Sequence, residues 1–284
     1  RSSRCRNGWL KLPINKSATQ LRSTILSNRR IGVYHQIVLE VGELVKQIKP
    51  GNFIAISVGG ETSKMVLRRA FAISRVNDRG TIELIISPQG SGSKWLCSQI
   101  EGAAVDVITP LGTAFGIPTE PVTALLVGGG YGSAPLFGLA EVLKSRGCRV
   151  IMALGASTAA KIYAPLEGKR AATLLKIFTE DGSAGEQGRV TDSLAELISE
   201  HDVRVMYSCG PMPMLEALSA IAIQSDIAHQ CAVEESMACG VGICMTCVMP
   251  VKTEDGEVKN LRSCIDGPVM DGERVQWHLV GEQL

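Results

Sequence analysis

Hydrophobic and polar positions follow two different rhythms along the chain. Before about residue 118, short stretches alternate between apolar and polar residues, and turn-forming Gly, Pro and Asn separate them. This pattern predicts the strands of a small antiparallel barrel. The predicted strands are Tyr34–Val41, Asn52–Val58, Thr81–Ser87 and Ala104–Pro110, and one helix is expected at Ser93–Ile100.

After about residue 118 the pattern changes to buried apolar runs that alternate with amphipathic stretches. Strands alternating with helices predict a parallel sheet covered by helices on both faces. The segment from His229 onward is rich in loops and cysteines, so we expect a third, smaller domain there. The predicted strands are Thr123–Gly130, Arg149–Ala156 and the run VRVMYSCGP; the predicted helices are Ala134–Ser145, Thr191–Ser199 and Met212–Ile223.

These patterns divide the chain into four parts. We expect a basic extension at residues 1–20, a β-barrel at 21–118, an α/β domain at 119–228 and a small cysteine-bearing domain at 229–284. The first 30 residues contain eight Lys or Arg and no acidic residue, a composition also found in organelle transit peptides. A solvated or frayed extension is the simpler interpretation.

The composition excludes several classes of protein. Hydrophobic residues make up 45% of the chain and charged residues 20%, as in ordinary globular proteins. A net charge of +1 gives no global field for nucleic acid or membrane, and an aromatic content of 4% argues against a base-stacking surface. No apolar run approaches the roughly 18 residues that a membrane span needs. Cysteines at thiol-ligand spacing suit a reducing compartment, so we expect a cytoplasmic protein.

Four cysteines near the C-terminus carry the most specific chemical signal. They are Cys239, Cys244, Cys247 and Cys264. Their spacing, C-x4-C-x2-C-x16-C, is the plant-type spacing of a [2Fe–2S] cluster, which four thiolates hold. Gly240 and Gly242 in the first interval let the backbone fold around an inorganic core and direct amides at its sulfurs. The pattern therefore predicts a one-electron carrier.

Two other uses of four cysteines remain open at this point. Structural zinc sites usually pair two short Cys-x2–4-Cys knuckles, whereas this chain has one tight triplet and a distant fourth cysteine. Two disulfides would suit a small secreted domain, and no feature of the sequence marks secretion.

Two strand ends of the predicted parallel sheet suit a dinucleotide. The turn VGGGYGSAPL allows close backbone approach to a phosphate, and the helix that follows adds amide donors. The second motif, YSCGPMPML, ends a strand at the same edge, which places its cysteine near a nicotinamide ring. A tight turn without a ligand and a buried structural cysteine are the alternatives. The residues concerned are Gly128, Gly130, Gly132, Cys209, Gly210 and Pro211.

Two polar features of the predicted barrel suit a flavin diphosphate. Arg69, within LRRAFAIS, offers a guanidinium group, although a solvated Arg pair is equally compatible with the sequence. Ser93, within GSGSKWL, is expected to cap a helix whose N-terminal amides favour an anion.

In order and spacing, these motifs resemble ferredoxin–NADP-reductase-type flavoproteins with a C-terminal [2Fe–2S] domain. Among them, the chain is most similar to the electron-transfer subunits of type B dihydroorotate dehydrogenases. The resemblance runs from about Leu21 to the end, and MACGVGICMTC followed by SCIDGPV is its most specific part. It implies FAD on the barrel, NAD on the parallel sheet and the cluster on the four cysteines. It places the flavin contacts at Arg69, Ala70, Phe71, Ala72, Ile85, Ile86, Ser87, Gly92 and Ser93.

Three positions affect the details of cofactor binding. Ala72 stands where the family has Ser or Thr, and Ser87 stands where the family often has Arg, so two flavin contacts would differ. Ser157 follows the second strand of the sheet with no neighbouring Arg to clamp a 2′-phosphate. We therefore expect NAD rather than NADP.

The resemblance also implies a partner. This would be an FMN-containing dihydroorotate dehydrogenase subunit, in a heterotetramer with two copies of each chain, that sends electrons through the cluster and FAD to NAD⁺ in pyrimidine biosynthesis. No acid–base constellation is evident in the sequence, because His35, His201, His229 and His278 are scattered. The alternatives are a reductase subunit of a ferredoxin:NADP oxidoreductase, hydrogenase or sulfite reductase, and a metal-bearing interaction module without nucleotide.

Overall fold

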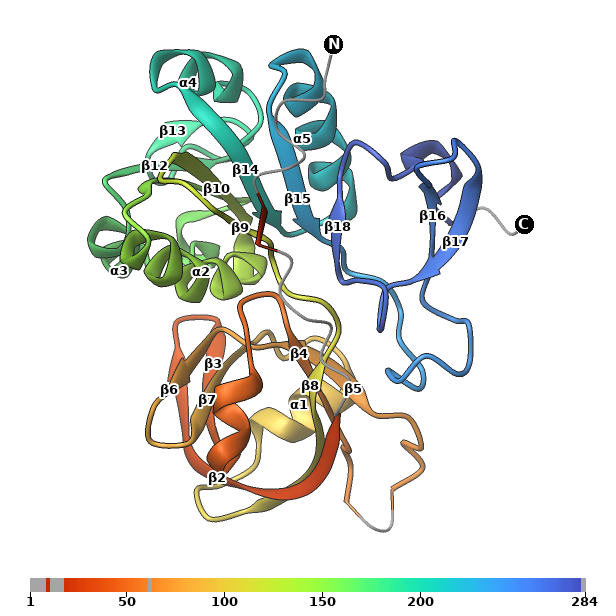
Figure 1. The fold of residues 1–284 in the computed structure, drawn as a ribbon. Helices are drawn as coiled ribbons and strands as arrows, with labels where there is room; N and C mark the ends of the chain where they lie inside the picture. Colours follow the sequence, from red (N-terminus) through yellow and green to blue (C-terminus); the bar gives the residue numbers. More distant parts are fainter. Residues whose placement is uncertain (1–8, 11–17, 61–62, 282–284) are drawn as a thin grey trace.

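The computed structural model describes residues 9–10, 18–60 and 63–281, and its chain forms three parts (Figure 1). A curled antiparallel sheet is followed by a parallel sheet flanked by helices, and a small cysteine-bearing part packs beside both. This arrangement confirms the predicted fold class. The predicted basic extension lies mostly outside the described residues, although β1 (Trp9–Leu10) pairs with β9 (Ile117–Pro118).

The barrel sheet has the strand order β5-β4-β8-β2-β3-β7-β6. Its strands are β2 (Thr19–Ile31), β3 (Tyr34–Glu40), β4 (Phe53–Ile56), β5 (Arg69–Ala72), β6 (Arg75–Asn77), β7 (Thr81–Ile86) and β8 (Ala104–Leu111). The long strand β2 was not predicted. It pairs with β8 along its first half and with β3 along its second, around a bulge near Ile25. Each half buries few side chains, so the sequence lacks a clear apolar alternation.

Two short helical segments accompany the barrel, η1 (Gly42–Gln47) and α1 (Ser91–Cys97). The prediction that Ser93 caps the helix over residues 93–100 is wrong, because α1 begins two residues earlier with Gly90 as its N-cap. The Ser93 hydroxyl instead lies 3.1 Å from the backbone nitrogen of Gly90, within the first turn.

The second sheet has the order β13-β12-β11-β10-β14-β15-β18, and its strands are parallel except for β18. They are β10 (Thr123–Gly129), β11 (Arg149–Ala156), β12 (Leu174–Thr179), β13 (Glu186–Gln187), β14 (Val203–Cys209), β15 (Ala228–Ala232) and β18 (Val269–Asp271). The helices are η2 (Gly130–Ser133), α2 (Ala134–Ser145), η3 (Ala159–Lys161), α3 (Pro165–Ala171), α4 (Leu194–Glu200) and α5 (Met212–Gln224). The bounds predicted for α2 and β11 are confirmed, whereas the helix expected from Thr191 begins three residues later and α3 was not predicted.

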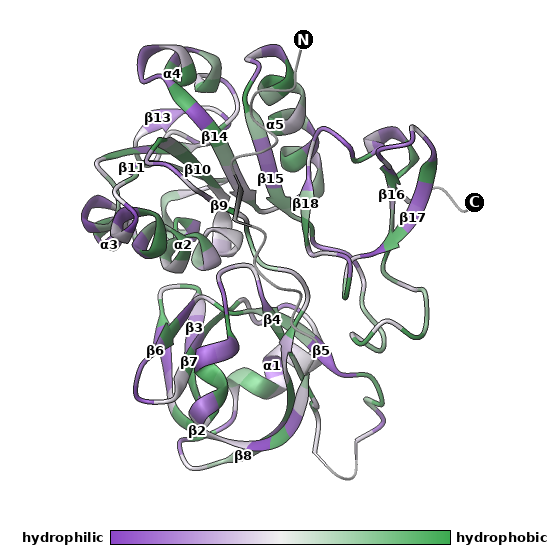
Figure 2. Ribbon diagram, viewed as in Figure 1, coloured by the Kyte–Doolittle hydropathy of each residue, from purple (hydrophilic) through white to green (hydrophobic). Residues whose placement is uncertain are grey.

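Alternate residues of β10 pack on opposite faces of this sheet. Ala124 and Leu126 pack with α2, while Leu125 and Val127 pack with α4 and α5. All four side chains are fully buried, which explains the continuous apolar run in the sequence. Figure 2 shows apolar residues concentrated on these central strands.

The last part of the chain contains a hairpin of β16 (Val248–Lys252) and β17 (Val258–Arg262), followed by η4 (Trp277–Leu279). The loop-rich description from the sequence is therefore incomplete. Strand β18 of this part pairs antiparallel with β15, so the cysteine-bearing part shares a sheet with the α/β part. The boundary proposed at residue 229 falls inside β15.

Arg75 of β6 links the barrel to the helices of the α/β part. Its guanidinium lies 3.1 Å from Glu141 of α2 and 2.8 Å from Glu167 of α3, and stands 5.5 Å from the ring centre of Phe137. Close by, the Ser74 hydroxyl donates to the carbonyl of Ala134 at 3.0 Å. These contacts hold the two parts in a defined orientation.

A buried histidine of β15 joins this strand to β14 and α5. The two ring nitrogens of His229 lie 2.7 Å from the Ser208 hydroxyl and 3.0 Å from the Ser219 hydroxyl. Because Ser219 already donates to the Leu215 carbonyl at 2.9 Å, it accepts from Nδ1–H, and Nε2 accepts from Ser208. The ring is therefore neutral, and burial lowers the pKa of His229 to about 3.

This histidine should make stability depend on pH. The unfolded chain protonates residue 229 below its usual pKa of 6.5, whereas the folded chain resists protonation to about 3. The free energy of unfolding should therefore decrease as the pH is lowered through this window. His229→Gln should make the decrease between pH 7 and pH 5 smaller by about 2 kcal/mol. Urea unfolding at both pH values measures this, with exposed His278→Gln as control. An unchanged loss in His229→Gln would contradict the buried neutral ring.

Candidate functional site

The first three cysteines lie on a tight loop that directs backbone amides at sulfur. The amides of Ile243 and Cys244 donate to the Cys239 sulfur at 3.3 and 3.5 Å. Gly240 and Gly242 make this possible, since both have positive φ, +70° and +84°. The Thr246 hydroxyl, 3.1 Å from the Cys244 sulfur, and nearby amides lower the pKa of Cys244 to about 6. The loop thus favours the thiolate form of Cys244, the form of cysteine that binds iron.

The hairpin explains the 16-residue gap before the fourth cysteine. Strands β16 and β17 pair with Val248 opposite Arg262, so the residues just outside the hairpin meet. The Ser263 amide donates to the Cys247 carbonyl at 2.7 Å. The Cys247 and Cys264 thiols are in hydrogen-bond contact, and both residues are buried. A spacing that is long in sequence is therefore short in space.

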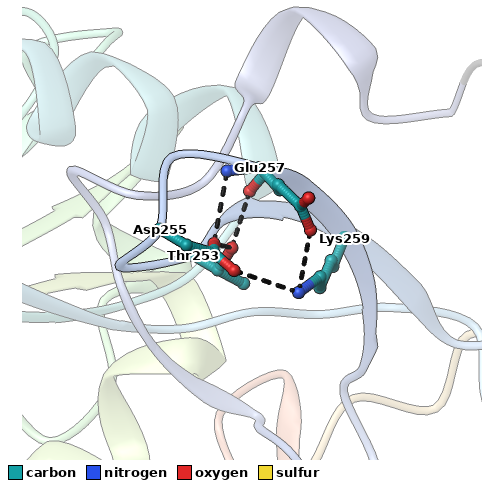
Figure 3. Close-up of polar contacts among 4 residues, drawn as sticks. All are labelled: Thr253, Asp255, Glu257 and Lys259. Carbon is teal, nitrogen blue, oxygen red and sulfur yellow. Dashed lines mark hydrogen bonds and ion pairs between the residues drawn. The ribbon is translucent and has the colours of Figure 1, made fainter.

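Polar contacts close the tip of this hairpin (Figure 3). The Thr253 hydroxyl donates to Asp255 and lies 2.9 Å from the Glu257 carbonyl. Lys259 bridges the carboxylates of Asp255 and Glu257 at 3.3 and 3.0 Å. Thr253 is half-buried and Asp255, Glu257 and Lys259 are exposed, and their contacts stabilise the turn between the two strands.

Contacts join the four cysteines in two pairs. The Cys244 amide donates to the Cys239 sulfur, and Cys247 packs with Cys264 in one apolar cluster. Among the described residues, no three His, Cys, Asp or Glu side chains are arranged to hold a single ion. A structural zinc ion would need all four thiolates around one point, whereas a [2Fe–2S] cluster divides its ligands between two irons. The donor set fits the cluster.

The cysteine loop rests on the barrel. A Cβ placed on Gly240 would stand 3.6 Å from the Cβ of Ala55 in β4. Around this contact, Phe53, Ala55 and Leu111 pack with Cys247 and Cys264 in one apolar cluster. The cluster ligands therefore lie directly against a barrel strand.

The predicted flavin segment occupies the strand next to this contact. In β5, Ala70 and Ala72 pair with Ala55 and Phe53 of β4, and paired residues share a face of the sheet. Ala70 and Ala72 are exposed on the face that also meets the cysteine loop. Arg69 and Phe71 are half-buried and lie on the opposite face.

Arg69 meets the other half of the predicted flavin motif. A Cβ on Gly92 would stand 3.1 Å from Arg69 Cγ and Nε, so a larger residue would press on the arginine where it crosses the start of α1. Ser93 lies one residue further on. The structure thus brings Arg69, Gly92 and Ser93 together. By contrast, the side chains of Ile85 and Ile86 are buried, Ile86 in the barrel core and Ile85 in the apolar cluster shared with the α/β part.

A cavity of about 690 Å³ opens at the carboxyl ends of the parallel strands, between the α/β part and the barrel. Of the predicted residues, it is lined by Ser87, Gly130, Gly132, Gly210 and Pro211. It is also lined by residues that sequence reasoning missed, among them Tyr34, Tyr131, Lys161, Glu180, Arg189 and Glu234.

Two predicted glycines allow close packing of neighbouring turns. A Cβ on Gly132 would stand 2.8 Å from Gly210 Cα, so the turns after β10 and β14 touch backbone to backbone. Gly128 packs against Ser133 and is not among the cavity-lining residues. Cys209 is also not among the cavity-lining residues, although its neighbour Gly210 is. Burial raises the pKa of the Cys209 thiol to about 12.

A hydrogen bond crosses the mouth of this cavity. The Tyr131 hydroxyl donates to Glu234 at 2.8 Å, and burial together with this carboxylate raises the pKa of Tyr131. On the barrel side, the Tyr34 hydroxyl donates to the Lys161 carbonyl at 2.7 Å. No local motif in the sequence indicates these contacts, because each joins residues that are far apart in the chain.

The described part of the chain contains no helix long and apolar enough to cross a membrane.

Comparisons with known proteins identify a matching family model and solved structures of similar fold. A family model described as the iron–sulfur cluster binding domain of dihydroorotate dehydrogenase B matches residues 234–276. A solved NADH-dependent reduced ferredoxin–NADP oxidoreductase superposes with a TM-score of 0.80 at 26% identity, covering 90% of each chain. An Amycolatopsis cytochrome P450 reductase superposes with a TM-score of 0.61 at 22% identity over 73% of this chain and 66% of its own. The protein is thus a ferredoxin-reductase-like flavoprotein in fold, with an added iron–sulfur part.

Two curated relatives define the family. A dihydroorotate dehydrogenase B (NAD⁺) electron transfer subunit from Caldanaerobacter subterraneus subsp. tengcongensis is 35% identical over 258 residues, covering 90% of this chain and 98% of its own. The subunit of the same name from Bacillus velezensis is 37% identical over 257 residues, covering 89% and 97%. The chain belongs to the family of dihydroorotate dehydrogenase B electron transfer subunits, which confirms the resemblance seen in the sequence.

The hairpin register gives a direct test of the cysteine site. An alanine inserted between Arg262 and Ser263 should displace Cys264 from Cys247 and abolish cluster assembly, measured by iron content and visible absorbance. A glycine inserted between Asp255 and Gly256 should leave the cluster intact, because the turn absorbs it away from the cysteines. Full iron content in the first variant would contradict the role of the register.

Proposed function

We propose that this chain is the electron transfer subunit of an NAD⁺-dependent dihydroorotate dehydrogenase. It passes electrons between a catalytic partner and NAD⁺ through a [2Fe–2S] cluster and FAD, in pyrimidine biosynthesis. The names of relatives that match nearly the whole chain support this function. FAD is needed between the two other carriers because it exchanges hydride with nicotinamide and single electrons with a cluster.

The contact of the cysteine loop with β4 carries this proposal. It places the cluster ligands on the same face of the barrel as Ala70 and Ala72, in the strand expected to hold the flavin. The nucleotide cavity opens between the barrel and the α/β part. A flavin on the barrel would therefore lie between the nucleotide and the cluster.

We assign the cluster ligands in pairs. Cys239 and Cys244 would hold one iron, and Cys247 and Cys264 the other, in accordance with the contacts between their thiols. Amides directed at the Cys239 sulfur would stabilise its negative charge.

We assign the flavin to the barrel segment around Arg69. The guanidinium beside Gly92 and the first turn of α1 would bind the diphosphate. Ser87 would approach the flavin from the rim of the cavity. Ala70, Phe71, Ala72, Ile85 and Ile86 would contribute backbone and apolar contacts. Because Ala72 has no hydroxyl, it would leave one polar flavin contact to the backbone.

We assign nicotinamide nucleotide to the cavity. Gly130 and Gly132, at the start of the α2 region, would admit the diphosphate close to the backbone. Gly210 and Pro211 would border the nicotinamide, and Cys209 would lie just behind them. Gly128 would act indirectly by allowing the turn.

The catalytic partner would bind near the exposed edge of the cluster. Ile243 and Met245, on the loop that carries Cys244, are 80% and 51% exposed. Exposed apolar side chains beside an electron carrier suit a protein contact. By family resemblance, the partner would contain FMN and oxidise dihydroorotate, with two copies of each chain in the complex.

The rival reading is a reductase subunit that serves a ferredoxin:NADP oxidoreductase. The structural similarity to such a protein supports it, at 26% identity. The curated relatives are closer in sequence, at 35% and 37%, and favour the dihydroorotate dehydrogenase. These relatives match nearly the whole chain, which argues against an interaction module that binds no nucleotide.

The cluster and the flavin should be separable by mutation. Cys247→Ser should abolish cluster assembly because it removes a buried ligand, while FAD remains bound to the barrel. Iron content and the flavin spectrum of the purified protein measure both. Loss of FAD together with iron would argue against separate sites.

The partner assignment is tested by reconstitution. The chain should co-purify with a dihydroorotate dehydrogenase catalytic subunit from its source, and the complex should reduce NAD⁺ when dihydroorotate is added. The Cys247→Ser complex is the matched control and should be inactive. A wild-type complex that reduces NAD⁺ only with reduced ferredoxin would support the rival reductase.

A further inference from the structure

We infer that Glu180 makes the nucleotide cavity selective for NAD over NADP by occupying the adenosine-ribose end. This inference rests on the proposed function, since it assumes that the cavity binds nicotinamide nucleotide. The lack of an Arg next to Ser157 does not by itself explain a preference for NAD, because the cations Lys161 and Arg189 also line the cavity.

Strand order fixes which end of the cavity receives the adenosine. The neighbouring parallel strands run β14, β10, β11, β12, so the residues that follow them line up along one edge. Gly210 follows β14, Gly130 follows β10, Ser157 follows β11 and Glu180 follows β12. With the diphosphate at the glycine turn and nicotinamide beside Gly210, the adenosine ribose falls toward β11 and β12.

The backbone holds Glu180 at this end. Its amide donates to the Ala156 carbonyl at 3.1 Å, and the Asp181 amide donates to the Ser157 carbonyl at 3.3 Å. These bonds tie the ends of β11 and β12 together, so Glu180 and Ser157 line the cavity side by side. The position of the Glu180 backbone therefore follows from the sheet rather than from a flexible loop.

The two neighbouring acids differ in what they bind. The Asp181 carboxylate accepts from the Ser183 amide at 3.0 Å and from the Ser183 hydroxyl at 2.6 Å, and Asp181 does not line the cavity. The Glu180 carboxylate forms no hydrogen bond or ion pair with another described residue and does line the cavity. Only Glu180 is thus available to a ligand.

A free carboxylate at this end discriminates by charge. It can accept hydrogen bonds from the ribose 2′- and 3′-hydroxyls of NAD. A 2′-phosphate would bring negative charge to the same place and be repelled.

Two cations nearby determine what happens when the acid is removed. Lys161 lies 3.1 Å from the Ser157 hydroxyl, and Arg189 lines the same cavity. The described side chains show no ion pair between Glu180 and either cation. Without Glu180, a 2′-phosphate would meet Ser157, Lys161 and Arg189, which suit it.

The test compares Glu180→Gln with Asp181→Asn in the full chain loaded with FAD and cluster. Calorimetry measures the dissociation constants of NAD⁺ and NADP⁺, and stopped-flow absorbance measures flavin reduction by NADH and NADPH. In wild type and Asp181→Asn, NAD(H) should be preferred. In Glu180→Gln, the NADP⁺ to NAD⁺ affinity ratio should rise about tenfold, the order of a lost charge repulsion at a partly screened site. Adding Arg189→Ala to Glu180→Gln should reverse most of that rise.

The outcomes separate this inference from the proposed function. If wild type binds and oxidises NADH but Glu180→Gln leaves the ratio unchanged, the inference is wrong and the function stands. An equal shift in Asp181→Asn would also overturn it, since that would indicate a general charge effect. If wild type binds neither nucleotide, both the proposed function and the inference fail.

Discussion

The close packing of the cysteine loop on barrel strand β4 is the contact on which the rest of the account depends. Gly240 meets Ala55 because neither residue has a side chain large enough to separate them. The inner cysteines, Cys247 and Cys264, are buried in the same apolar cluster as barrel residues. A one-electron carrier bound by these cysteines would therefore lie directly against the barrel.

Two further contacts join the parts of the chain. Arg75, which is half-buried, joins the barrel to α2 and α3 through two carboxylates, and a charge removed from part of its water stabilises only when its partners are in place. The neutral ring of His229 joins β14, β15 and α5 next to β18, which belongs to the cysteine-bearing part. The cavity proposed to bind the nucleotide lies between parts that these contacts join.

Local signals in the sequence were sufficient for much of this structure. Helix α2 and strand β11 could be predicted because their periodicity is complete within short segments. Strand β2 could not be predicted, because its two halves pair with different strands and each half buries few of its side chains. The prediction of Ser93 as the N-cap of α1 is wrong because the helix begins two residues earlier, after Gly90. The roles of Glu180 and of the Tyr131–Glu234 bond depend on strand order and on packing across the cavity, which a single sequence does not display.

The central claim is that nicotinamide, flavin and cluster form one electron path within this chain. Anaerobic addition of NADH to the purified chain, without its partner, tests this most directly by electron paramagnetic resonance and visible absorbance. The account predicts that the flavin absorbance bleaches and that the signal of a reduced [2Fe–2S] cluster follows. A reduced flavin beside a cluster that stays oxidised, in protein with full iron content, would contradict it.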